Sequence, residues 1–134
     1  LFKMESDIVP IFQSCIEGTL DKSMTIGWKE GVSVCVVIAS KGYPDSTEKG
    51  MVINGLEDIK GRKDIMVFHG GTKKIGHKFY TAGGRVLGVT AIGKTYEDAI
   101  KKVYEAVSCI QFDGMQYRKD IGAKALSFVL QKRN

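Results

Sequence analysis

The sequence predicts an α+β fold, a small and mostly antiparallel β-rich domain with one long helix and a C-terminal helix. Several short β-branched runs precede the strongest amphipathic helix pattern, and strands do not alternate regularly with helices. A chain of 134 residues, 43% of them apolar and 26% charged, can bury such a core without disulfides. We therefore expect one such domain, preceded by a single separate helix.

The first predicted helix begins after Ser6 and Asp7 and ends at Gly18. Apolar residues recur at helical spacing, namely Ile8, Ile11, Phe12, Cys15 and Ile16. This spacing predicts a one-sided helix of about three turns. Its apolar face needs a partner, and the sequence leaves open where that partner lies.

Strand patterns follow. Val32–Ala39 is β-branched and nearly unbroken, which is typical of a strand buried on both faces. Shorter strands are predicted at 51–53, 65–68 and 85–92, and a hairpin at 75–80 with its turn near Gly76.

The long helix begins at Thr95, and Asp98 completes a pattern similar to a capping box. One apolar face is formed by Tyr96, Ala99, Ile100, Val103, Val107 and Ile110. An extended segment at 115–118 and a last helix at 123–132 complete the predicted elements.

Composition restricts the class of protein. Cys15, Cys35 and Cys109 are scattered through apolar patterns, so we expect buried reduced thiols and neither a disulfide nor a metal site. No apolar run reaches the roughly 20 residues of a membrane span, and no signal peptide is recognised. We expect a cytoplasmic protein with no membrane partner.

Charge is unevenly distributed. The net charge is +5, but residues 1–23 carry −2 and residues 24–134 therefore carry +7. The larger part should favour an anionic ligand such as a phosphate or a nucleic acid. A solvated basic surface explains the same excess equally well.

Common catalytic motifs are absent from the sequence. It contains no HExxH, Walker or GxSxG pattern, so we predict no catalytic residue and no metal ligand. Cys35 lies within an apolar strand pattern and is expected to pack in the core. His69 is expected to be a hydrogen-bonded residue and not a base.

Two short segments have the character of a binding surface. Ser40–Pro44 leaves a predicted strand, and Gly83–Arg85 enters another, where glycines permit close approach and arginine can bind an oxyanion. Each segment alone is also ordinary turn chemistry. On adjacent strands they would form one anion pocket with candidate contacts from Ser40, Lys41, Gly42, Tyr43, Gly84 and Arg85.

The predicted hairpin offers an alternative function. Basic residues lie there with two aromatic residues beside them, namely Lys73, Lys74, His77, Lys78, Phe79 and Tyr80. Such a surface can track phosphates and stack bases. This pattern supports a non-catalytic module for an anionic ligand or single-stranded nucleic acid, although a solvated hairpin tip explains it too.

Four blocks of sequence come in order along the chain, namely 36–44 (VVIASKGYP), 68–72 (FHGGT), 83–93 (GGRVLGVTAIG) and 117–122 (YRKDIG). Together they resemble the C-terminal region of the phosphoribosylamine–glycine ligase family, whose members are ATP-grasp enzymes of purine biosynthesis. The resemblance extends from about Glu5 to Leu126. It implies that residues 1–23 end an ATP-grasp domain and that residues 24–134 form the ligase C-terminal domain.

The resemblance also implies a reaction, in which glycine is joined to 5-phosphoribosylamine through a glycyl phosphate while ATP becomes ADP and phosphate. ATP and Mg²⁺, with Mn²⁺ as an alternative, would be bound mainly by upstream domains of the same polypeptide, so this chain should be inactive alone. Its role would be to close the substrate cleft, with Arg85 and Lys41 near the ribose phosphate. Nucleic acid is then not expected as a partner, and Arg118 and Asp120 are expected to form a structural pair.

Overall fold

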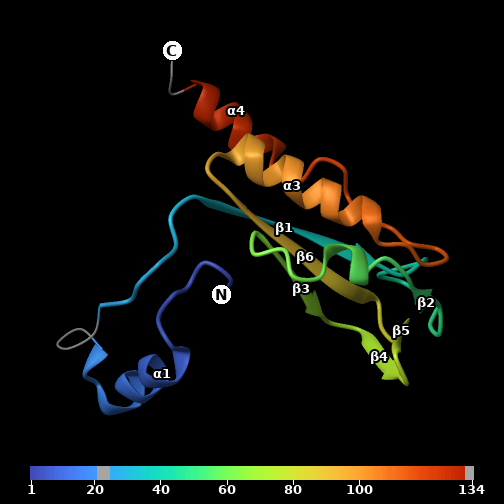
Figure 1. Ribbon diagram of the computed structural model, residues 1–134, viewed down its shortest axis with the longest axis horizontal. Coiled ribbons are helices and arrows are strands. Elements are labelled where there is room, and N and C mark those ends of the chain that lie inside the picture. The colour runs from blue at the N-terminus through green and yellow to red at the C-terminus, as the bar shows by residue number, and fades with distance from the viewer. Residues whose placement is uncertain (21–24, 132–134) are drawn as a thin grey trace. The chain divides into compact units, whose positions relative to one another are not determined.

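The computed structural model describes residues 1–20 and 25–131, and the chain divides into two compact units (Figure 1). The first unit is Leu1–Gly31 and the second is Val32–Asn134. The domain boundary expected at residues 23 and 24 lies outside the described residues.

The first unit contains helix α1, Ile8–Glu17. The Asp7 carboxylate accepts a hydrogen bond from the backbone N–H of Val9 at 2.9 Å, and Gly18 ends the helix in the left-handed region with φ 67°. Both ends therefore agree with the sequence. The predicted apolar face is largely uncovered, since Phe12 and Ile16 are exposed and only Ile11 is buried.

The second unit is built on a three-stranded antiparallel sheet with strand order β1-β6-β3. Its strands are β1 (Val32–Ala39), β6 (Arg85–Gly93) and β3 (Ile65–His69). Helix α3, Tyr96–Cys109, lies along one face of this sheet (Figure 1). The Thr95 hydroxyl accepts a hydrogen bond from the backbone N–H of Asp98 at 3.2 Å, which confirms the predicted start.

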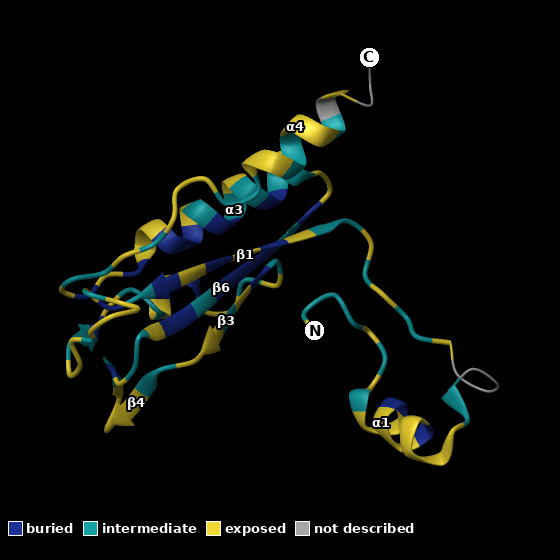
Figure 2. Ribbon diagram, turned by 180° about the vertical axis from the view of Figure 1, so that it is seen from behind, coloured by how far each residue is buried: buried dark blue, intermediate teal, exposed yellow. Residues whose placement is uncertain are grey.

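The core lies between this sheet and α3. Inward side chains of β1 and β6 meet the buried face of the helix, and Figure 2 shows buried segments on β1, β6 and α3 in dark blue. Fully buried members include Val36, Ile38, Val89, Ala99, Val103 and Val107. The apolar periodicity of the helix therefore becomes the contact surface that holds the sheet.

A second antiparallel sheet has strand order β2-β5-β4. It comprises β2 (Val52–Ile53), β5 (Lys78–Thr81) and β4 (Thr72–Ile75), and the short 3-10 helix η1 (Glu57–Ile59) follows β2. Gly76, with φ 58°, begins the turn between β4 and β5, so the predicted hairpin is confirmed. The last described element is helix α4, Ala123–Gln131.

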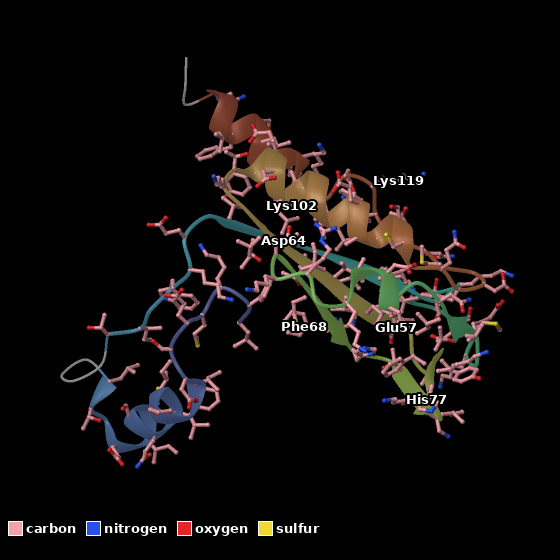
Figure 3. The ribbon with its side chains drawn as sticks, in the orientation of Figure 1. Glu57, Asp64, Phe68, His77, Lys102 and Lys119 are labelled. Carbon is pink, nitrogen blue, oxygen red and sulfur yellow. The ribbon has the colours of Figure 1, made fainter. Side chains whose placement is uncertain are left out.

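An ion-pair network joins the turn before β3 to α3. Both nitrogens of the Arg62 fork donate to the Asp64 carboxylate, at 3.2 and 3.1 Å. Lys102 Nζ lies 3.8 Å from Asp64 and 2.9 Å from Asp98, and Figure 3 shows Lys102 directed toward Asp64. The arginine hydrogen bonds lower the pKa of Asp64 below its usual value.

Strand β1 differs from the prediction that both its faces are buried. Its residues alternate, with Val34, Val36 and Ile38 buried while Cys35 and Val37 are exposed. The reason is that α3 covers only one face of the sheet. Within the described residues, apolar side chains on the opposite face remain accessible to solvent.

The prediction of buried cysteines is also wrong. All three thiols are free, as expected, but each is exposed. Cys35 lies on the sheet face opposite α3, and Cys109 lies at the end of α3, where its thiol donates weakly to the Glu105 carbonyl at 3.4 Å. Cys15 belongs to α1 and is exposed although it lies one turn after the buried Ile11.

Candidate functional site

The two predicted binding segments lie at the same end of the main sheet. Ser40–Pro44 follows β1 and Gly83–Arg85 leads into β6, and these strands pair antiparallel with Ala39 opposite Arg85. A register shift between Ile38 and Ala39 marks the end of the regular ladder. The expectation that adjacent strands bring the segments together is therefore met.

Ser40 ties the two segments to each other. Its side chain is only 2% exposed, and its hydroxyl donates to the Gly83 carbonyl at 3.0 Å. Its backbone N–H donates to the Gly84 carbonyl at 2.9 Å. The predicted contact residue thus has a positioning role, because both of its donors are directed at the neighbouring segment and not at solvent.

Tyr43 packs on Gly84 from the other segment. A Cβ at Gly84 would lie 2.3 Å from Cδ2 of the Tyr43 ring, which no side chain could tolerate without displacement of the ring. Gly42 holds φ 83°, a conformation that favours glycine, and its carbonyl accepts from Ser46 at 2.9 Å. The glycines are therefore required by packing and by backbone conformation at this site.

A third segment supports the first two. Gln116 forms a two-hydrogen-bond bridge with Ala39, at 2.8 and 2.9 Å. A Cβ at Gly114, which has φ 70°, would lie 2.7 Å from the Cβ of Lys41. The only local turn pattern here is the dipeptide Asp113-Gly114, and nothing in its spacing links it to Lys41.

Arg85 and Lys41 differ in how far their charges are available. Among the described residues, the exposed Arg85 guanidinium has no hydrogen bond or ion pair with protein groups. Lys41 Nζ lies 3.3 Å from the Glu48 carboxylate, and both side chains are exposed. Arg85 is thus the more available cation for an incoming anion.

A cavity of about 490 Å³ adjoins Tyr43. It is bordered by apolar groups from β1 and by the segment before α4, namely Cys35, Val37, Ala39, Tyr43, Tyr117 and Ile121, together with Gln116 and Arg118. Arg118 donates two hydrogen bonds to Asp120, at 2.9 and 2.6 Å, which lower the pKa of Asp120. The expected pairing of these two residues is therefore present.

His69 has a partner for its ring nitrogen and a stacking contact for its ring. His69 Nδ1 lies 3.0 Å from the Thr72 hydroxyl, its ring stacks at 4.4 Å on Phe79, and partial burial lowers its pKa. This is the hydrogen-bonded role that the sequence predicted.

In the described part of the chain, no group of three or more His, Cys, Asp or Glu side chains could hold a metal ion. Each described helix also falls short of the length and hydropathy needed to cross a bilayer.

The fold and the paired segments define a small α+β domain in which two loops at one sheet end present Arg85, which no described residue pairs with. Residues 33–124 match the family described as phosphoribosylglycinamide synthetase, C domain. The chain therefore belongs to this family.

Known proteins agree with this assignment. The chain is 47% identical over 131 residues to the bifunctional purine biosynthetic protein purD of Dictyostelium discoideum, covering 97% of this chain and 16% of that protein. It is 48% identical over 116 residues to the phosphoribosylamine–glycine ligase of a Synechocystis strain, covering 87% of this chain and 27% of the ligase.

A solved structure shows the same fold. The crystal structure of the phosphoribosylamine–glycine ligase from Thermotoga maritima aligns with a TM-score of 0.66 and 34% sequence identity. The alignment covers 84% of this chain and 27% of that one. The chain thus spans roughly a quarter or less of the length of these relatives.

Proposed function

We propose that this chain acts as the C-terminal domain of a phosphoribosylamine–glycine ligase in purine biosynthesis. The observation that carries the proposal is the match to the ligase C-domain family, supported by relatives named as this ligase at 40% identity or more. In the proposed reaction, ATP transfers its terminal phosphoryl group to the glycine carboxylate and leaves as ADP. The amine of 5-phosphoribosylamine then attacks the acyl carbon and expels phosphate, forming the amide.

The proposed role of the chain in this reaction is to position the substrate. Arg85 is exposed and has no partner among the described residues, and its loop is fixed to Ser40 by two hydrogen bonds. A guanidinium held in this way can bind the ribose phosphate in bidentate fashion and close one side of the cleft. Lys41 would bind the phosphate more weakly than Arg85, since its ammonium group already pairs with the Glu48 carboxylate.

ATP and Mg²⁺, or Mn²⁺, are assigned in this proposal to parts of a longer ligase. No described group of acidic, histidine or cysteine side chains suits a metal ion, so no step through the metal is assigned to these residues. We accordingly propose that the chain has no ligase activity unless it is joined to the other domains.

A domain exchange tests the proposal. The matching region of the Synechocystis ligase is replaced by this chain, and ADP release is measured with ATP, glycine and freshly prepared phosphoribosylamine. We expect activity from the exchanged enzyme and none from the enzyme that lacks the region. An exchanged enzyme that folds and binds ATP but forms no product would contradict the proposed function.

Arg85→Ala in the exchanged enzyme should weaken the use of phosphoribosylamine while leaving the KM for ATP unchanged. A charge-assisted hydrogen bond of this kind contributes about 1.5 to 3 kcal/mol. Lys94→Ala is a matched control, because Lys94 is an exposed cation just beyond the opposite end of β6. Equal effects from the two substitutions would remove Arg85 from the phosphate site.

A further inference from the structure

The outer face of the β2-β5-β4 sheet carries a row of three side chains whose order is fixed by the strand register. Lys73 lies opposite Tyr80, and Tyr80 lies opposite Val52, so the three residues share one face. The next row, Lys74, Phe79 and Ile53, belongs to the other face, where Ile53 is buried. Lys73 therefore lies on the outer side of Tyr80, away from β2.

A cavity of about 590 Å³ lies on the β2 side of Tyr80. Val52 and Tyr80 line it, together with two flexible thioethers from Met51 and Met115. Aromatic and thioether groups of this kind make favourable contacts with the flat face of a polarisable ring. The cavity wall thus has the chemistry of a stacking site.

Three polar side chains at the same cavity have no hydrogen bond or ion pair within the described residues, namely Asn54, Gln111 and Asp113. The backbones of Asn54 and Gln111 bond to each other at 2.9 and 3.1 Å, which fixes the two residues side by side. Their amides can both donate and accept, and a carboxylate accepts from an amino group. Such groups match the edge of a purine base.

The junction that holds these groups is closely packed. Gly55 follows Asn54 with φ 82°, and a Cβ there would lie 1.7 Å from the Cys109 carbonyl oxygen. The end of β2 is thereby pressed against the end of α3. The polar groups are carried by a rigid junction and not by a free loop.

The segment that contains β4 and β5 carries basic but no acidic residues. Between Asp64 and Glu97 the sequence has no acidic residue. Lys73 and Lys78 are exposed and have no protein partner among the described residues, and His77, labelled in Figure 3, stands at the turn between their strands. This surface can therefore accept a phosphate beside the aromatic ring.

We infer that this face binds a purine nucleotide, with the base in the Met51, Tyr80 and Met115 cavity and the phosphate at Lys73. Adjacent strands are about 4.8 Å apart, so Val52 and Lys73 are separated by roughly 10 Å across the sheet. That separation, together with the reach of a lysine side chain, suits a base and the phosphate attached to its ribose. The site lies outside the Ser40 and Arg85 loops and does not depend on ligation.

The test is a titration of the ¹⁵N-labelled 134-residue chain, followed by amide NMR shifts, with three probes. The probes are AMP, adenosine, which lacks the phosphate, and ribose 5-phosphate, which lacks the base. We expect AMP to bind more tightly than either fragment and to shift the amides of Asn54, Gln111 and Met115. Ribose 5-phosphate binding as tightly as AMP, or shifts confined to the hairpin tip, would overturn the inference.

Two lysine variants locate the phosphate. Lys73→Ala should weaken AMP binding about tenfold and leave adenosine binding unchanged, because only the charge-assisted contact is lost. Lys74→Ala is the matched control, since the adjacent residue faces the other side of the sheet and lies over Phe79 at 5.5 Å. Equal loss of AMP binding in both variants would indicate general charge attraction and overturn the assigned site.

An oligoadenylate in a parallel titration distinguishes the source of the nucleotide. Tighter binding than AMP with the same shifted amides would support the base and phosphate contacts and assign them to a nucleic acid strand. Absence of shifts with both AMP and the oligoadenylate would refute the site. Either result is independent of the domain exchange, because no ligation is measured.

Discussion

Removal of the Ser40 hydroxyl should loosen the link between the two loops at the end of the main sheet. Ser40→Ala deletes the hydrogen bond to the Gly83 carbonyl, whose donor side chain is 2% exposed. A neutral hydrogen bond contributes about 0.5 to 1.5 kcal/mol, and an unsatisfied buried partner adds about 1 to 3 kcal/mol. Gly83 is half-buried and partly reachable by water, so we expect a loss of about 1 to 2 kcal/mol.

The assay is urea unfolding of the chain followed by circular dichroism. The free energies of unfolding are compared when the variants share the same dependence of that free energy on urea concentration. Ser33→Ala is the control, because Ser33 is exposed on β1, the strand that leads into Ser40, and loss of its hydroxyl should change stability by no more than about 0.5 kcal/mol. Equal stability losses in the two variants would refute the argument that Ser40 joins the loops through its hydroxyl.

Three other substitutions probe the fold. Gly93→Ala should cost about 3 kcal/mol or more in urea unfolding, because a Cβ there would lie 2.3 Å from the backbone nitrogen of Ala99; a stable variant would contradict this packing. Thr95→Ala should cost about 1 kcal/mol by the same assay through loss of the α3 cap. Asp64 has a lowered pKa because of Arg62, so its contribution to stability is present above about pH 4 and lost as the pH falls through the folded-state value. The stability gap between the natural chain and Asp64→Asn should therefore narrow from pH 6 to pH 3, and a constant gap would exclude the ion pair as its source.

The elements that the sequence predicted best are those determined by local patterns. Helix α3 follows from the Thr95 cap and a regular apolar face, and the hairpin follows from a glycine turn between two short strands. These signals lie within a few residues of the structure that they specify. The antiparallel arrangement followed from the order of strands and helices along the chain.

Features that depend on distant residues could not be predicted. The run of valines in β1 indicated burial on both faces, whereas Cys35 and Val37 are exposed because α3 covers only one side. A weak signal was present, since Ser33 and Cys35 alternate with valine. The division of the six described strands into two sheets had no local signal, because strand partners depend on packing across the whole unit.

The sequence predicted where the candidate site lies but not how its side chains are directed. Two loops on adjacent strands were expected and found, but the inward direction of the Ser40 hydroxyl and the pairing of Lys41 with Glu48 depend on side-chain geometry. The contact between Gly114 and Lys41 joins residues far apart in sequence. Such contacts leave no periodic trace in a single sequence.

Because the backbone is closely packed around the Gly83 turn, the conformation of each of the two loops depends on the other. A Cβ at Gly71 would lie 2.6 Å from the Gly83 Cα, and the Gly71 N–H donates to the Arg85 carbonyl at 2.7 Å, while Ser40 holds the same turn from the other side. If either loop alone were grafted into a relative, it would therefore lack the contacts that the other loop provides. Recombination between ligases should preserve the geometry around Arg85 only where both loops are exchanged together with the turn at Gly71.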